Sequence, residues 1–101
     1  HKRSIFFDKE NRVIEITDTV EGSDPASVAR FHLAPGIGAR QSSPGVFELP
    51  GCTVEFEGFS GIETGDYQYS PEYGVRVTAQ RIEVAFGNRL RTRIALEREE
   101  R

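Results

Sequence analysis

Methionine and tryptophan are absent from this 101-residue sequence, and cysteine occurs once, at Cys52. A single thiol cannot form a disulfide within the chain, so a disulfide framework is excluded and nothing marks an oxidising compartment. We expect Cys52 to be a small buried hydrophobic residue, because a catalytic thiol needs a nearby base and none is close in sequence. The sequence has no apolar run of about 18 residues, which excludes a transmembrane helix.

A basic excess is also missing, since the net charge is −3 and the sequence pI is about 5.4. This balance argues against a nucleic-acid binder. Apolar residues make up 37% of the chain and charged residues 29%, as in a folded domain. The length fits one domain, residues 1–101. The chain begins at His1 with neither an initiator Met nor a signal peptide, which suggests a domain excised from a longer protein.

Short alternating runs separated by turn residues recur along the chain, and none shows sustained helical periodicity. They predict an all-β fold, an antiparallel β-sandwich of about eight short, hairpin-rich strands. The candidate strands are residues 4–8, 12–17, 27–33, 46–49, 52–57, 59–63, 74–79, 82–86 and 90–96. Residues 64–73 carry Gly, Asp, Ser and Pro and are predicted to be irregular.

Three hairpins are expected from the turn signals. Residues 4–8 and 12–17 are joined by a polar turn, and 46–49 and 52–57 by Pro50-Gly51. The third joins 82–86 to 90–96 through a loop at 87–89, which sets Phe86 opposite Leu90 and Glu83 opposite Arg93. A change in apolar phase near Gln80 predicts a bulge or turn there.

The best candidates for sugar contact are Tyr67, Tyr69 and Tyr73. Aromatic faces stack on the apolar side of sugar rings, and the phenol adds a donor. The alternative is that these side chains fill the core or a domain interface.

A second candidate surface is a basic strand edge made by Arg91 and Arg93 with Arg89. Guanidinium groups match carboxylates and sulfates in two-point contacts, so an acidic polysaccharide could dock there. The competing interpretation is a solvated strand face, with Glu83 and the run from Glu97 to Glu100 neutralising the charge.

A zinc shell would need His1, Asp18 and His32 to converge. We expect no convergence and no metal site, because His32 points away from the apolar face of its strand. We expect His32 to take part in a hydrogen-bond network or to contact a neighbouring domain or the substrate. Asp18 lies on the same strand face as the apolar Ile14 and Ile16, so its carboxylate must have hydrogen-bond or ion-pair partners. We expect backbone N–H groups of the following turn to do this, in preference to a substrate role.

Three ordered features resemble the heparinase II/III-like polysaccharide lyases. They are HKRSIFF (1–7) followed by VIEITD (13–18), FHLAP (31–35), and YSPEYGV (69–75) followed by a hairpin ending in LRT (90–92). Their order and spacing resemble the later half of that family's β-sandwich and cover most of the chain.

The resemblance implies a bacterial parent that cleaves uronate-containing polysaccharide by β-elimination. It also implies a helical toroid, N-terminal in the same parent chain, that holds an acidic polysaccharide against the sandwich. The family's catalytic groups and metal site come chiefly from the toroid and the early sandwich, so no catalytic residue, metal ligand or cofactor is assigned here. A periplasmic or secreted parent is implied in the same way.

The resemblance favours a non-catalytic C-terminal sandwich that supports the toroid and contributes to the sugar cleft. One alternative is an autonomous carbohydrate-binding module, which would show the three tyrosines open to solvent on one flat face. Another is a structural interaction domain without a ligand. A lyase wall would instead expose an apolar patch where the toroid docks. Neither nucleic acid nor membrane is expected as a partner.

Overall fold

The computed structural model describes residues 1–21 and 27–97, and these form one antiparallel sheet of seven strands. The predicted all-β class is therefore confirmed. Within these residues no helix is long and apolar enough to cross a membrane. The strands are β1 (Lys2–Asp8), β2 (Val13–Thr19), β3 (Ser27–His32), β4 (Arg40–Ser43), β5 (Val46–Leu49), β6 (Cys52–Glu72) and β7 (Val75–Leu96).

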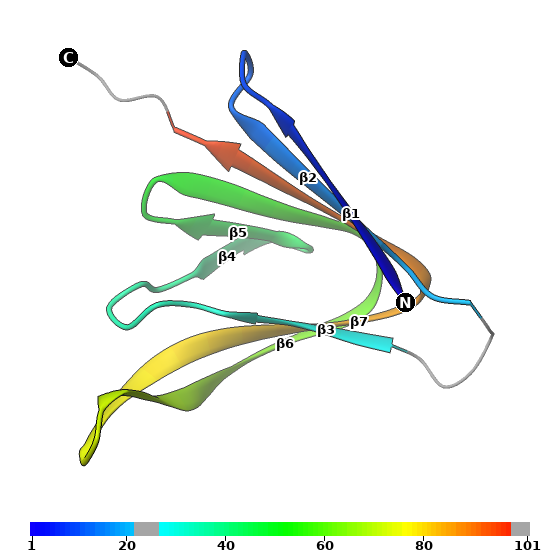
Figure 1. Cartoon of the computed structure of the whole chain (residues 1–101). Helices are drawn as coiled ribbons and strands as arrows, with labels where there is room; N and C mark the ends of the chain where they lie inside the picture. The colour runs from blue at the N-terminus through cyan, green and yellow to red at the C-terminus, as the bar shows by residue number, and fades with distance from the viewer. Residues whose placement is uncertain (22–26, 98–101) are drawn as a thin grey trace.

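Two long strands, β6 and β7, fold the sheet over on itself (Figure 1). The C-terminal half of β7 pairs with β2, and its N-terminal half pairs with β3. One layer therefore has the order β1-β2-β7-β6-β5-β4, and the opposite layer contains β3 with the other halves of β7 and β6. This arrangement is compatible with the predicted sandwich, although a single bent sheet supplies both layers.

The bend lies where the register between β6 and β7 shifts, around Gly58 and Gly87. Glu57 pairs with Arg91 and Phe59 with Phe86, so β7 carries extra residues opposite Gly58. Such an insertion bends a strand and increases its twist. The third predicted hairpin is therefore wrong. The turn-like residues at 87–89 mark a bend within β7, and the chain does not reverse there.

Glycine is required at position 58 and not at position 87. Gly58 has φ +92°, and an added Cβ would lie 2.8 Å from the backbone oxygen of Arg89. Gly87 has no positive φ and nothing within 4 Å of an added Cβ. Gly58→Ala should therefore lower the free energy of unfolding by about 2 kcal/mol, whereas Gly87→Ala should be nearly neutral. Chemical denaturation tests this pair, and equal effects would contradict the assigned bend.

Two further predictions along these strands are corrected. The segment 64–73, predicted to be irregular, belongs to β6 up to Glu72, because pairing with β7 supplies its backbone hydrogen bonds; the predicted strand 59–63 is part of the same β6. No bulge occurs at Gln80, since the ladder there is continuous. The phase change arises because Ile82 faces the space between the layers while Ala79 faces the opposite side of the sheet.

The two earlier hairpins are confirmed. β1 and β2 pair in register along all of β1, and Asp8 accepts hydrogen bonds from the backbone and side chain of Asn11 across their turn. β5 and β6 pair from Leu49 opposite Cys52, through the predicted turn at Pro50-Gly51. Sequence-local turns thus fix the hairpins that flank the long strands.

The hydrophobic core fills the region where the two layers face each other. Burying such side chains contributes roughly 1.5–3 kcal/mol each, which makes this cluster the main source of stability. Its buried members are Ala29, Phe47, Val54, Phe56, Ile82, Val84, Phe86 and Leu90.

Candidate functional site

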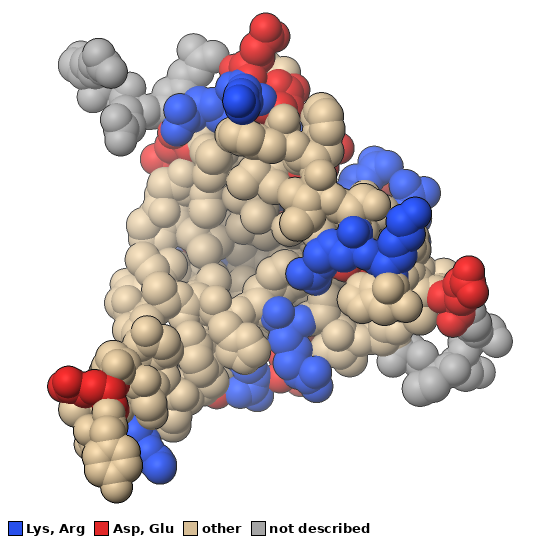
Figure 2. Space-filling view, in the orientation of Figure 1, with Lys and Arg blue, Asp and Glu red and all other residues tan. Residues whose placement is uncertain are grey.

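An apolar groove opens between the two layers beside the core. Its volume is about 360 Å³, which is in the range of ligand or docking clefts. Figure 2 shows a hollow between the layers on this face, walled mainly by uncharged residues. The groove is lined mostly by apolar side chains, among them Phe31, Leu33, Leu49, Cys52, Val54, Phe56, Ile82 and Ile94.

The polar residues of the groove lining are Thr92 and, from β3, Arg30 and His32, and the lining also holds the thiol of Cys52. Cys52 is half-buried and packs against the core, close to the prediction of a buried residue. Burial raises the pKa of the Cys52 thiol, and the charges of Glu97 and Glu48 raise it further, so the thiol is a poor nucleophile at neutral pH. Among the described residues, the buried hydroxyl of Thr92 has no hydrogen-bond partner.

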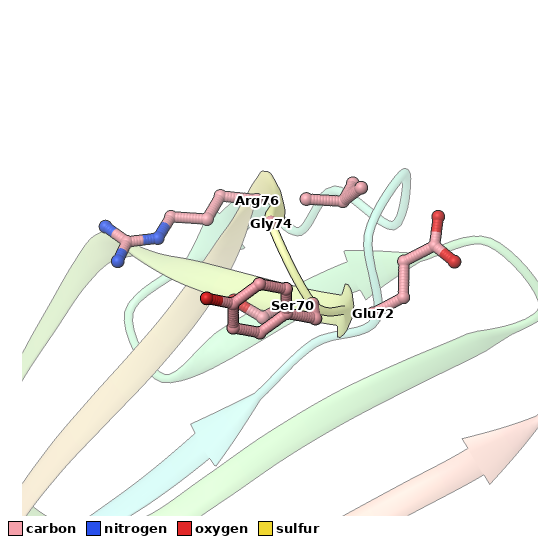
Figure 3. A pocket seen from close by; sticks show the side chains of 6 residues that line it. Ser70, Glu72, Gly74 and Arg76 are labelled. Atoms are coloured by element: carbon pink, nitrogen blue, oxygen red, sulfur yellow. The ribbon is translucent and has the colours of Figure 1, made fainter.

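The joined ends of β6 and β7 extend away from the two layers (Figure 1). Tyr73 lies in this turn and is fully exposed, while Tyr69 is 41% exposed and pairs with Val77. Ser70, Glu72 and Arg76 complete an open pocket with Tyr73. Figure 3 shows Glu72 and Arg76 extending to opposite sides of this hairpin end. The hairpin end thus presents an aromatic ring and a guanidinium group to solvent.

Tyr67 makes internal contacts, unlike the exposed Tyr69 and Tyr73. Its hydroxyl donates a 2.6 Å hydrogen bond to the backbone oxygen of Leu33, and its ring meets the His32 ring edge-on at 4.7 Å between centroids. Tyr67 therefore anchors the segment after β3 to β6. The predicted substrate residues Tyr67 and His32 do lie together, on the face of the sheet opposite to the core.

The arginines of the predicted basic edge alternate with carboxylates and hydroxyls across the outer face. Arg93 stands between Glu15 and Glu55, and Arg91 between Thr17 and Glu57. Of the predicted neutralising residues, Glu83 lies in the other layer, so that part of the prediction is wrong, while Glu99 and Glu100 lie outside the described residues. Cross-strand opposite charges of this kind are typical of a solvated sheet face.

Asp18 is fully buried and is held by side chains from β1 and the residue before it. Arg3 donates from Nε to Oδ1 at 2.7 Å and from Nη2 to Oδ2 at 3.3 Å. Nε2 of His1 lies 3.1 Å from Oδ1. Arg3 reaches Asp18 because β1–β2 pairing sets the two residues directly opposite each other. Residues 22–26 of the turn expected to supply backbone N–H groups lie outside the described residues. His32 does not join them, and no group of three metal-ligating residues occurs among the described residues.

A second charged cluster lies beside His32 on the outer face of the β3 layer. Arg81 donates from Nε to Glu83 at 2.6 Å, and Nε of Arg30 lies 3.4 Å from the other carboxylate oxygen. Arg81 also donates to the backbone oxygen of Asp66. The hydrogen bond from Arg81 lowers the pKa of Glu83, and the charges of Arg81 and Arg30 act in the same direction.

The lowered pKa of Glu83 predicts that its ion pair stabilises the fold and that this stabilisation is lost at acidic pH. Because the folded pKa of Glu83 lies below its unfolded value, its contribution is complete above the unfolded pKa and disappears as the pH falls through the folded pKa. Arg81→Gln should move the pKa of Glu83 back toward its ordinary value, which a side-chain carboxyl titration by NMR can follow. A pKa that is unchanged in Arg81→Gln would show that this hydrogen bond is not the cause.

Several residues of these sites were not predicted from the sequence. Arg76 was missed, although it is three residues from Tyr73 on the other side of a tight turn. Arg3 could have been found by counting outward from the Asp8–Asn11 turn, since the hairpin register sets it opposite Asp18. The groove residues carried no signal of their own, because apolar residues at alternating positions predict a core face.

Comparison with known proteins gives one result. The family model described as "Heparinase II/III-like, C-terminal" matches residues 1–97. The chain has no significant match among curated proteins or solved structures. Since the match covers nearly the whole chain, the resemblance seen in the ordered motifs is confirmed. The chain belongs to the heparinase II/III-like C-terminal domain family.

Proposed function

We propose that this domain is a non-catalytic β-sandwich wall of a bacterial polysaccharide lyase. It supports a helical toroid of the same parent chain and contributes to the cleft in which uronate-containing polysaccharide is cleaved by β-elimination. The proposal rests on the family, on the apolar groove and on the exposed hairpin end. In this proposal the proton-transfer groups belong to other parts of the parent.

The observation that carries the proposal is the apolar groove between the layers. Phe31, Leu33, Leu49 and Ile94 line it from both layers, so an apolar element inserted there would touch both at once. Burial of apolar surface is the main driving force for domain docking. Arg30, His32 and Thr92 are the polar residues in a lining that is otherwise apolar apart from the thiol of Cys52, which favours docking of an apolar element.

The exposed area of the chain also favours a docked partner. The chain exposes 7289 Å², whereas a compact monomer of 11.3 kDa should expose about 5,700 Å². The radius of gyration, 14.9 Å, likewise exceeds the value of about 13 Å typical of compact domains of this length. The extended hairpin end of β6 and β7 contributes to this excess, which leaves surface free for a neighbour.

The hairpin end is the element best placed to reach sugar. Tyr73 and Tyr69 offer ring faces, and Arg76 offers a two-point partner for a uronate carboxylate. An extension of this kind can overhang a cleft that lies beside the docked surface. His32, Arg91 and Arg93 are weaker candidates, since His32 contacts Tyr67 and the two arginines lie opposite Glu57 and Glu55 of β6.

Docking is tested with a substitution in the groove and a matched one outside it. Leu33→Glu puts a carboxylate in the groove lining and should abolish binding to the parent's helical toroid in isothermal titration calorimetry. Val28→Glu changes an exposed residue of β3, the strand directly before Leu33. Val28 faces away from the core, so this substitution should leave the affinity unchanged. Equal affinities for the two variants would overturn docking through the groove.

The chain alone should release no unsaturated uronate from heparin, heparan sulfate or alginate. Ultraviolet absorbance of the unsaturated product measures this directly. Measurable release that survives repurification would refute the non-catalytic role.

A carbohydrate-binding module remains the second candidate, favoured by the exposure of Tyr73 and Tyr69. Against it, Tyr67 has its hydroxyl engaged and Tyr73 lies in a turn, so the three rings do not form one platform. Amide shifts of the isolated chain test this candidate. Saturable shifts around Tyr69 and Tyr73 at submillimolar oligosaccharide would favour the module, and no response to any glycan would favour a structural domain without a ligand.

A further inference from the structure

β1 is an edge strand with an unusually apolar sequence. In the part of the chain that the structure describes, β1 pairs with β2 along one edge and with no strand along the other. Its middle residues Ile5, Phe6 and Phe7 are 66%, 64% and 48% exposed. An exposed, regular apolar edge offers free backbone donors and acceptors to another strand.

The other sheet edges are protected against such pairing. β4 has only four residues, all polar, and its ladder is interrupted by a register shift between Gln41 and Ser43. β3 carries the charged Arg30 in its centre. The outer side of β6 is also unpaired beyond Glu55, but it carries Glu57, Glu63, Asp66 and Pro71, and the unpaired side of β7 before Arg81 carries Arg76.

β1 is seven residues long and contains neither proline nor a bulge, and its one charged residue between the ends, Arg3, is engaged by Asp18 of the same copy. Short, charged or bulged edges resist pairing, so among the described residues β1 is the edge most open to a partner.

The charges at the two ends of β1 fit a second copy of the same strand. Identical antiparallel strands related by a two-fold axis pair about a central residue. With Ile5 at the axis, Lys2 of each copy lies opposite Asp8 of the other, and all seven residues are used. The pair of opposite charges then occurs twice, once on each side of the axis.

Neighbouring registers lose this complementarity. Centring on Ser4 sets Lys2 opposite Phe6 and leaves Asp8 without a partner in β1. Centring on Phe6 sets Asp8 opposite Ser4 and leaves Lys2 unpaired. Opposite charges across a strand pair stabilise it by a few tenths to about 1 kcal/mol. The Ile5-centred register is therefore preferred.

The same register also joins apolar surface across the axis. Ile5 and Phe7 share a face with Ile16 and Ile14, their partners in β2. Pairing sets Ile5 against Ile5 and Phe7 against Arg3, whose guanidinium can rest on the ring. Arg3 keeps its contact with Asp18, because that contact lies within one copy.

We propose that two copies of this chain associate through antiparallel pairing of their β1 edges, with Ile5 at the two-fold axis. The interaction surface is separate from the groove that docks the toroid in the proposed function. Failure of one proposal therefore leaves the other standing.

Sedimentation velocity from micromolar to millimolar chain tests the association. The unmodified chain should shift from monomer to dimer as concentration rises. Ile5→Lys sets two ammonium groups at the axis and should remove the dimer over the whole range, while Val28→Lys, on the β3 edge, should retain it. Circular dichroism confirms that each variant is folded. A chain that stays monomeric, or a dimer that survives Ile5→Lys, overturns the proposal.

Cysteine cross-linking tests the register. In a Cys52→Ser background, Ile5→Cys places two thiols opposite each other with Cα atoms about 4.5–5.5 Å apart, within the disulfide range of about 4.4–6.8 Å. Oxidised glutathione should then yield a covalent dimer. Ser4→Cys is the control, because each Ser4 would face Phe6 and the two thiols would be too far apart. Equal cross-linking of both variants would contradict the Ile5-centred register.

Discussion

Phe86→Ala should cost about 3–5 kcal/mol of the free energy of unfolding, as expected for removal of a buried phenylalanine ring. Phe86 is 1% exposed and lies on β7 at the bend, opposite Phe59 of β6 and Ser27 of β3. Its ring fills the place where the two layers meet, and the long strands on either side cannot close the cavity without changing the bend. Since domains of this size have about 5–15 kcal/mol of stability, the variant should unfold at much lower denaturant.

The matched control for Phe86→Ala is Phe6→Ala. Phe6 is 64% exposed on β1, so its removal should change stability by no more than about 0.5 kcal/mol. Urea denaturation at micromolar concentration, where the chain is monomeric, compares the two. Similar losses for both variants would contradict the placement of Phe86 in the core.

Arg3→Ala should cost about 3 kcal/mol, because it leaves the buried Asp18 carboxylate without its two-point partner. The Asp18 side chain is fully buried, whereas that of Arg3 is 44% exposed. The charge left behind is therefore the buried one, with only His1 beside it. Leaving a buried charge without its partner is more costly than breaking a pair at the surface.

Two further variants test whether the loss comes from the unpaired buried charge. Arg30→Ala breaks the pair with Glu83, whose side chains are 59% and 25% exposed, and should cost less than about 1 kcal/mol. Arg3→Ala combined with Asp18→Asn should recover part of the loss, since asparagine leaves no buried charge. Equal losses for Arg3→Ala and Arg30→Ala, or no recovery in the double variant, would contradict the assigned role of the buried pair.

The sequence predicts the parts of this fold that depend on local turns. Asp8–Asn11 and Pro50-Gly51 are strong turn signals, and both hairpins follow them. The alternation in β3 also holds, with Ala29 buried while Val28 is exposed. These features arise from backbone preferences over a few residues, which a sequence displays directly.

The long strands could not be predicted in the same way. β6 contains Gly61, Gly65 and Pro71, and locally these residues favour irregular structure. They are extended because β7 pairs with them, a contact made between distant parts of the chain. Likewise, Gly87 and Asn88 resemble a turn, and only the pairing of β7 with both β2 and β3 shows that the strand continues.

The candidate sites follow the same division. The exposure of Tyr73 could be expected from its position in a turn. The hydrogen bond from Tyr67 to the backbone oxygen of Leu33 depends instead on how the segment after β3 crosses β6. The groove depends on how sharply the sheet bends at Gly58 and on how far its layers splay. A sequence pattern shows which residues are apolar, but the curvature of the sheet determines which of them stay exposed in the groove.

A partner domain that covers the groove between the layers would also cover Cys52, so the reactivity of this thiol measures docking directly. The Cys52 thiol lies in the groove lining and is the only one in the chain. The rate of Cys52 alkylation by iodoacetamide should be slow in the isolated chain and should fall further, in a saturable manner, as the parent's helical toroid is added. An alkylation rate that stays constant while calorimetry shows the toroid bound would contradict the account.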